Sequence, residues 1–185
     1  MIKGYPDPAT DYPGWLKATE TEDMPDFVNL LCEIREAIGF EPKRILDFGY
    51  GWGISHALWL TSFPDCTVTC CDILKQGEYD DTDPVSKLPC IDRWTYFNES
   101  AEDVLVTNIE PFDFIFVDAD HAYRSTLNQV RLSWQKLLPG GVMAGHDWAY
   151  PTVQSAVNEF MRDNGLRGQV WEIDNGGWMI RKCTP

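Results

Sequence analysis

Apolar residues recur along the chain at two spacings, one typical of helices and one typical of buried strands. Four segments have the helical spacing, with apolar side chains three and four residues apart, namely 25–38, 54–62, 123–137 and 152–164. A fifth helix is predicted to begin after Ser100, because Ser100 is a good N-cap and Asp103 takes the capping-box position. Seven short apolar runs read as strands, namely 44–48, 67–71, 94–97, 112–117, 142–145, 169–173 and 178–181.

The order of these segments predicts the fold class. Strands that alternate with helices form a parallel sheet with right-handed crossovers. The last two strands flank Asp174-Asn175-Gly176-Gly177, which is a turn signal and indicates a hairpin. We therefore expect an α/β fold with a Rossmann-like, doubly wound, mostly parallel seven-stranded sheet that ends in a C-terminal antiparallel hairpin.

The chain shows no internal repeat and no linker, so a single domain is expected over residues 25–185. Residues 1–24 are rich in proline, tyrosine and acidic side chains and are predicted to be an irregular N-terminal arm. Residues 75–92 lack periodicity and are expected to be a loop.

Charge and cysteine content limit the partners. Fifteen basic against 29 acidic residues give a formal charge of −14, which disfavours nucleic acids and anionic membranes. The first residues lack an apolar signal region and no segment is apolar enough to span a bilayer, so a cytoplasmic protein is expected. The six cysteines form no CxxC pair and are expected to be reduced and structural. The sequence leaves a homodimer open.

Polar side chains stand where the predicted strands end. They are Asp47, Asp72, Asn98, Asp118 and the pair His146-Asp147. In doubly wound sheets, ligands bind beyond the carboxyl ends of the strands. These positions therefore predict a binding site at one edge of the sheet.

A glycine loop, Asp47-Phe48-Gly49-Tyr50-Gly51-Trp52-Gly53, follows the first strand. It does not fit the dinucleotide fingerprint, because Ile54 occupies the third glycine position. A carboxylate ahead of the loop suits a ligand with positive charge, such as a sulfonium, and Asp72 can accept both hydroxyls of a ribose. The alternative is a turn without any nucleotide.

The loop resembles motif I of class I S-adenosylmethionine (SAM)-dependent methyltransferases, and Asp72 resembles their motif II acid. The resemblance extends over roughly residues 40–182 and implies SAM as the cofactor. The cofactor-binding residues it implies are Asp47, Gly49, Tyr50, Gly51, Gly53, Asp72, Ile73, Ser100, Ala101 and Asp118.

Residues 112–121 (FDFIFVDADH) and 140–148 (GGVMAGHDW) are similar to the bacterial methyltransferases of family 24 and, more distantly, to the catechol and caffeoyl-coenzyme A O-methyltransferases. The resemblance implies Asp118, His121, His146 and Asp147 as catalytic residues. It implies Asp118, His146 and Asp147 as ligands of Mg²⁺ or another divalent cation. A histidine replaces the family's lysine base at 121, and a second one at 146 weakens the preference for magnesium.

These residues predict a SAM-dependent methyltransferase that methylates a small molecule on oxygen, with His121 as general base. Structural alternatives exist: Asp118 and Asp120 could cap the following helix, and His146 could pack under a loop. His56 is expected to be structural, and Trp148 is expected to face the acceptor. Two other functions are open. One is a SAM-binding protein without methyltransferase activity. The other is a nicotinamide dehydrogenase, which the glycine spacing and the lack of a Tyr-x-x-x-Lys pair disfavour.

Overall fold

The computed structural model describes residues 14, 25–73, 84–107 and 110–184. The predicted N-terminal arm, apart from Gly14, and residues 75–83 of the predicted 75–92 loop lie outside this description. Among the described helices, none is long and apolar enough to cross a membrane.

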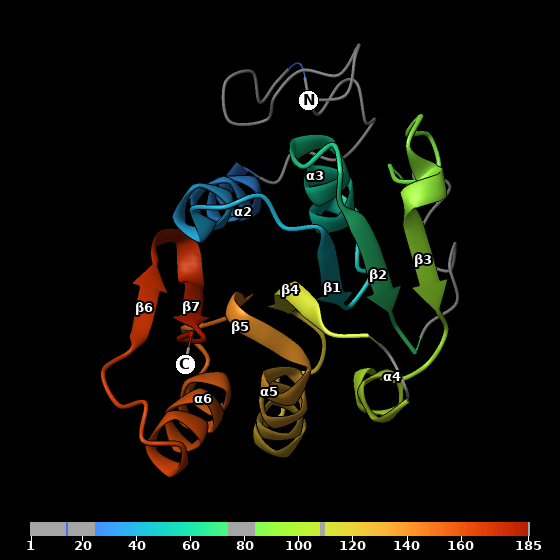
Figure 1. Cartoon of the computed structure of the whole chain (residues 1–185). Helices are drawn as coiled ribbons and strands as arrows, with labels where there is room; N and C mark the ends of the chain where they lie inside the picture. The colour runs from blue at the N-terminus through green and yellow to red at the C-terminus, as the bar shows by residue number, and fades with distance from the viewer. Residues whose placement is uncertain (1–13, 15–24, 74–83, 108–109, 185) are drawn as a thin grey trace.

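Seven strands form one sheet in the order β3-β2-β1-β4-β5-β7-β6 (Figure 1). Their bounds are β1 Arg44–Phe48, β2 Thr67–Cys71, β3 Trp94–Phe97, β4 Phe112–Val117, β5 Leu137–Gly145, β6 Val170–Ile173 and β7 Gly177–Arg181. The pairs among β1 to β5 are parallel, whereas β7 is antiparallel to both β5 and β6. The predicted Rossmann-like sheet with its antiparallel C-terminal hairpin is confirmed.

Helices cover both faces of the sheet. Their bounds are α2 Pro25–Ile38, α3 Ile54–Ser62, α4 Ala101–Val106, α5 Tyr123–Lys136 and α6 Pro151–Asp163, with short 3₁₀ turns η1 Ile91–Arg93 and η2 Asp174–Gly176. Figure 1 shows α2 and α3 on one face and α4, α5 and α6 on the other. Each face has its own apolar core.

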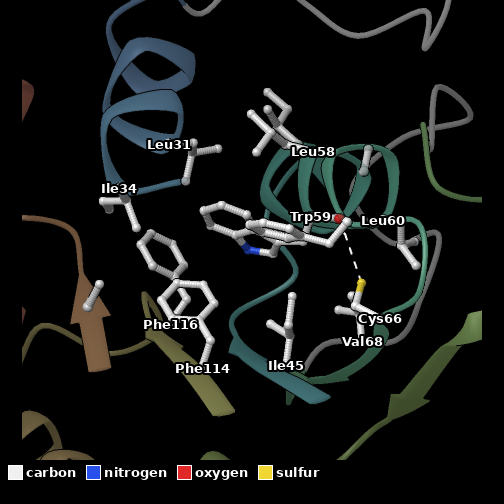
Figure 2. Packing of buried hydrophobic residues seen from close by; sticks show 14 of the residues in the cluster. Leu31, Ile34, Ile45, Leu58, Trp59, Leu60, Cys66, Val68, Phe114 and Phe116 are labelled. Atoms are coloured by element: carbon white, nitrogen blue, oxygen red, sulfur yellow. Dashed lines mark hydrogen bonds between the residues drawn. The ribbon is translucent and has the colours of Figure 1, made fainter. Parts of the chain in front are cut away.

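Trp59 of α3 is at the centre of the first core (Figure 2). Its ring meets Phe114 and Phe116 of β4 edge-on, with centroids 5.1 and 5.8 Å away. The C-terminal end of α3 is closed by Arg93, whose guanidinium donates to the carbonyls of Leu60 (2.7 Å), Phe63 (3.0 Å) and Cys66 (2.8 Å). Arg93 thus fixes the connection between α3 and β2.

One predicted boundary is wrong. The strand expected at 142–145 begins at Leu137, directly after α5, and includes Pro139-Gly140-Gly141. Phe112 of β4 pairs with Leu137 and Phe114 pairs with Val142, so the register shifts and residues 138–141 of β5 form a bulge. Proline and glycine suggested a turn, but a bulge on a strand needs the same backbone freedom.

The chain reverses the direction of strand order between β1 and β4, which are neighbours in the sheet. The loops after these two strands therefore leave the same edge side by side. This is the place where a doubly wound sheet binds its ligand.

Candidate active site

The glycine loop after β1 turns sharply at Gly49, Gly51 and Gly53, which have φ angles of 82°, 49° and 70°. At Gly49 the backbone of the neighbouring β4 end passes so close that an added Cβ would collide with the Asp118 carbonyl and lie 3.0 Å from its carbon. At Gly51 no atom of the described residues lies within 4 Å of such a Cβ. The loop is therefore packed against β4 at its start and open at its middle.

A cavity of about 420 Å³ lies beside the loop, between the ends of β1, β2 and β4 and helices α4 and α5. Seven of the ten predicted cofactor residues line it, namely Gly49, Gly51, Asp72, Ile73, Ser100, Ala101 and Asp118. The cavity wall also includes Cys71, Glu102, Ala119, Asp120, Ser125 and Gln129, which the sequence did not suggest as binding residues.

Tyr50 and Gly53 have supporting positions. The Tyr50 amide donates to Asp72 Oδ2 (2.7 Å), which joins the loop to the end of β2. The Tyr50 ring is buried, stacks on His56 and leaves only the backbone side of the loop toward the cavity. Gly53 precedes α3, and a Cβ there would lie 2.9 Å from the Tyr50 hydroxyl.

Asp47 does not line the cavity, contrary to the direct contact expected from the sequence. Its side chain is fully buried, where Oδ2 accepts from Trp59 Nε1 (2.9 Å) and lies 3.3 Å from His56 Nδ1. The reason is strand alternation: Asp47 shares the face of β1 with Ile45, toward α3. Burial raises the pKa of Asp47 well above its ordinary value.

His56 connects Asp47 to the loop, because its Nε2 lies 3.1 Å from the Gly49 carbonyl. The predicted structural role of His56 agrees with this position. Asp47 and His56 thus support the glycine loop from the side of the sheet that α3 covers. Sequence reasoning missed this pairing, although Asp47 and Ile45 share a strand face by parity alone.

Ser100 is the N-cap of α4, as predicted, and its Oγ accepts from the Asp103 amide (3.1 Å). Its hydroxyl also donates to Asp103 Oδ2 (2.7 Å). Before the other helix of the wall, Asp120 Oδ1 accepts from the Ala122 amide (2.9 Å). The N-cap of α5 is Ala122, so Asp120 supports the turn before the helix and is not its capping residue.

Four titratable side chains converge beyond the ends of β4 and β5. His121 Nε2 lies 2.7 Å from Asp147 Oδ2 and 3.7 Å from Asp118 Oδ1. His146 Nδ1 lies 3.5 Å from the same Asp147 oxygen and 3.7 Å from the same Asp118 oxygen. The four residues predicted as catalytic therefore form one cluster.

The surroundings hold this cluster in place. Asp147 has a φ of 58°, unusual for a residue other than glycine, which turns its carboxylate back toward His121. The His121 ring stacks on Tyr150 with centroids 5.4 Å apart, and the His146 ring packs against Phe27 at 5.1 Å. His121 remains 43% exposed, although its Nε2 atom is shielded from solvent. The exposed part of the side chain is therefore not the Nε2 atom.

The two carboxylates and two imidazoles change each other's protonation. The Asp118 carboxylate raises the pKa of His121 above its ordinary value. Burial would lower the pKa of His146, but Asp118 and Asp147 outweigh it and raise that pKa. Burial would raise the pKa of Asp118, but the two histidines outweigh it and lower that pKa. Each of the two histidines therefore holds a proton more tightly than a free imidazole does, and Asp118 releases its proton more readily than a free carboxyl group.

The cluster can also hold a cation. The donor atoms of Asp118, His121 and Asp147 all lie within 4.8 Å of one another. Ligands at right angles on bonds of about 2.1 Å are about 3.0 Å apart, close to several of the separations above. The geometry thus brings His121 into the ligand set, whereas the sequence suggested His146 beside the two aspartates.

Trp148 does not face the site, which corrects the expectation that it would contact the acceptor. It is only 9% exposed and packs in the core beneath α6. A smaller cavity of about 140 Å³ on the other side of the loop is lined by Phe27, Tyr50, Trp52, Ile54 and His146, among others. The aromatic side chains near the cluster therefore come from α2, from the glycine loop and from Tyr150 at the start of α6.

The sheet order, the glycine loop and the acid at the end of β2 define the class: this is the fold of class I SAM-dependent methyltransferases. Residues 46–148 match a family model described as "Methyltransferase domain", of the type numbered 24. The chain belongs to this methyltransferase family. No curated protein matches the chain in sequence.

Solved structures share the fold at low sequence identity. A putative caffeoyl-CoA O-methyltransferase from Staphylococcus aureus has a TM-score of 0.71 at 16% identity, over 94% of this chain and 91% of that one. A putative O-methyltransferase from Klebsiella pneumoniae has a TM-score of 0.67 at 17% identity, over 99% and 93%. An O-methyltransferase from Bacillus cereus, solved in complex with SAH, has a TM-score of 0.61 at 17% identity, over 89% and 86%. Structures described as rRNA methylases are also similar, so the fold does not distinguish acceptor classes.

Proposed function

We propose that this protein transfers the methyl group of SAM to a hydroxyl of a small molecule, with His121 as the general base. One observation carries the proposal: Asp118, His121, His146 and Asp147 meet beside the cavity of the glycine loop, and Asp118 belongs to both. The base must lie next to the acceptor oxygen, and that oxygen must face the methyl group of SAM. A cluster beside the cofactor cavity supports this arrangement.

The 420 Å³ cavity fits the proposed cofactor. Its loop wall has no side chain at Gly49 and Gly51, and a carboxylate at Asp72 can accept ribose hydroxyls. When bound, SAM supplies a methyl group that its sulfonium already activates. The protein has only to align the acceptor and manage its proton.

The surroundings of His121 suit it to accept the proton of the acceptor hydroxyl. Its Nε2 faces Asp147 at 2.7 Å, and a carboxylate in this position favours the tautomer with hydrogen on Nε2. Nδ1 is then free to accept the proton of the acceptor hydroxyl. Asp118 and Asp147 stabilise the imidazolium that results, in agreement with the raised pKa of His121.

A divalent cation would provide a second way to activate the hydroxyl, since it lowers the pKa of an oxygen bound to it. Asp118, Asp147 and one or both histidines would hold it. If His121 Nε2 is a ligand, the hydrogen moves to Nδ1 and His121 no longer accepts a proton. The two mechanisms exclude each other in that arrangement, whereas a cation held by Asp118, Asp147 and His146 would leave His121 available as the base.

A small acceptor is proposed for two reasons. The 140 Å³ cavity beside His146 has an aromatic wall, and the formal charge of −14 repels a phosphate backbone. Cytoplasmic location remains a prediction from the sequence, which leaves a homodimer open.

The first test is calorimetric titration of the folded protein with SAH, the demethylated product. Absence of binding refutes the proposal. Turnover is then measured as SAH release over a panel of phenols and catechols, with and without a chelator. Activity that survives the chelator argues against the metal. Tight SAH binding without turnover on any acceptor would favour a binding protein that lacks methyltransferase activity.

Variants separate the roles of the two histidines. His121→Ala should keep SAH affinity and lower turnover at least about a hundredfold, as expected for loss of a general base. His146→Ala is the matched control, because it removes the other imidazole from the same carboxylates. Unchanged turnover in His121→Ala would remove this residue from the role of base. Equal losses of turnover in both variants, together with loss of the native protein's activity on chelation, would favour the metal.

A further inference from the structure

One peptide unit of the glycine loop, between Gly49 and Tyr50, is held at both ends. Its carbonyl oxygen lies 3.1 Å from His56 Nε2, on the side of α3. Its N–H donates to Asp72 Oδ2 (2.7 Å), at the end of β2. The carbonyl and the N–H belong to one planar unit and point in opposite directions, so the contact at either end orients the other. Two side chains thus fix the direction of this peptide plane.

The contact with the carbonyl fixes the hydrogen positions on His56. A carbonyl oxygen only accepts hydrogen bonds, so His56 Nε2 must carry a hydrogen to bond to it. Cys70 Sγ lies 3.5 Å from the same nitrogen and can share this hydrogen as a weak acceptor. Within the described residues, no backbone N–H donates to the Gly49 carbonyl. The imidazole therefore supplies a hydrogen bond that the backbone does not.

Asp47 keeps the hydrogen on that nitrogen. Its Oδ2 lies 3.3 Å from His56 Nδ1, and both side chains are fully buried. With Nε2 protonated, a second hydrogen must lie between Nδ1 and Oδ2, because two lone pairs that face each other repel. Burial raises the pKa of Asp47, which agrees with a proton held between the two side chains. Trp59 Nε1 donates to the same carboxyl oxygen (2.9 Å) and fixes the orientation of the pair.

Glycine at position 49 leaves the peptide plane free to rotate unless its ends are bound. Glycine enters more backbone conformations than other residues, and its φ of 82° lies in a region that it enters readily. A rotated plane would take the Tyr50 N–H away from Asp72, and the carboxylate would lose this donor. The buried imidazole therefore excludes conformations that the glycine would otherwise allow.

We propose that His56 is a positioning residue for cofactor binding, which orients the Gly49–Tyr50 peptide so that its N–H holds the Asp72 carboxylate in place. This inference rests on the proposed function, in which Asp72 accepts the ribose hydroxyls of SAM. Asp72 lines the 420 Å³ cavity, whereas His56 is fully buried and does not. His56 therefore acts through the loop and not by contact with the ligand.

The test uses two substitutions that each keep one of the two histidine nitrogens. In His56→Gln the side-chain amide nitrogen reaches about as far as Nε2, so the donor to the Gly49 carbonyl is kept. In His56→Asn the amide reaches only as far as Nδ1, so the partner of Asp47 is kept and the donor to the carbonyl is lost. In calorimetric titration, His56→Gln should bind SAH within about threefold of the native affinity, and His56→Asn at least about tenfold more weakly, as expected for one lost hydrogen bond. Equal losses in the two variants would overturn the inference.

A double-mutant cycle shows whether His56 acts through Asp72. In the Asp72→Ala background, His56→Asn should change SAH affinity by less than about threefold, because the carboxylate that it positions is gone. A histidine with a purely structural role would give losses that add, and additive losses would overturn the inference. Cys70→Ala is the control, since it removes the sulfur near Nε2 and should leave SAH affinity unchanged. A loss as large as that of His56→Asn would make the thiol the partner of Nε2 and would also overturn the inference.

NMR of the native protein with labelled histidine nitrogens decides the matter if the variants do not fold. At neutral pH, His56 Nε2 should carry a hydrogen and the Tyr50 amide should exchange slowly with solvent. An Nε2 without hydrogen, or a rapidly exchanging Tyr50 amide, would overturn the inference but not the methyltransferase proposal. Failure of the native protein to bind SAH would overturn both.

Discussion

The close approach of Gly49 to the end of β4 gives a prediction that can be worked out from the structure. Replacement by alanine has two costs at this position. The φ of 82° is unfavourable for any residue with a Cβ, at about 1–2 kcal/mol. The added methyl group also meets the Asp118 backbone, and displacing packed atoms costs about 1–3 kcal/mol more.

Gly51 provides the matched comparison in the same loop. Its φ of 49° carries the conformational cost, but in the part of the chain that the structure describes no atom lies within 4 Å of an added Cβ. We expect Gly51→Ala to lower the free energy of unfolding by about 1 kcal/mol, and Gly49→Ala by about 3 kcal/mol. For a domain of this size these losses correspond to decreases in Tm of about 2–4 °C and 6–12 °C.

Differential scanning calorimetry of the two variants without ligand measures both values. Similar decreases in Tm would show that the loop can move away from β4 at no cost, and the reasoning would be refuted. A second readout is SAH affinity. It should fall in Gly49→Ala, because the displaced backbone belongs to Asp118, which lines the cofactor cavity.

Three further results are expected. Arg93→Ala should lower the free energy of unfolding by about 2–4 kcal/mol, since three carbonyls lose a charged donor, and urea unfolding with Arg93→Lys as an intermediate variant checks this; an unchanged midpoint would contradict it. In thiol titration of the native protein at about pH 8, exposed Cys183 should react fast and half-buried Cys32 more slowly. Cys66, Cys71 and Cys90 should not contribute to the fast phase, because burial raises the pKa of Cys66 to about 11 and also raises the pKa of the other two thiols. A fast phase that persists in Cys183→Ser would be the opposing result. Asp72→Ala should weaken SAH binding at least about tenfold in calorimetry through lost ribose contacts, whereas Asp65→Ala, which removes an exposed charge, should not; equal affinities of both variants would argue against the ribose contact.

Much of the fold could be predicted because it follows from local spacing. The bounds of α3, β2 and β3 agree with the periodicity, since each begins and ends at a change in the spacing of apolar residues. The start of β5 was wrong because a bulge and a turn use the same residues, proline and glycine. Only the partner strand shows which of the two is present.

The candidate site was predictable where it depends on strand ends. Asp118, His146 and Asp147 follow neighbouring parallel strands, so their proximity follows from the topology. The orientation of Asp47 is different, because it depends on which face of β1 receives α3. Trp148 directly follows His146 and Asp147 in sequence, yet it is buried in the core after the turn at Asp147.

Two linked hydrogen bonds in the cavity wall, from Gln129 Nε2 to Ser125 Oγ and from Ser125 Oγ to Glu102 Oε1, could not be predicted from the sequence. Ser125 and Gln129 are four residues apart on one helix, which a periodic pattern reveals. Their connection to Glu102 depends on the contact of α5 with α4, across a separation of 23 residues. No local signal in the sequence indicates that contact.

The four side chains proposed to be catalytic follow β4 and β5, strands in the interior of the sheet with a paired neighbour on each side. Backbone amides of such strands exchange with solvent only when the whole domain opens. Fraying of the outer strand β6 or of a surface loop therefore leaves the four side chains in register. Loss of catalytic competence on heating should thus coincide with cooperative melting of the entire sheet rather than precede it.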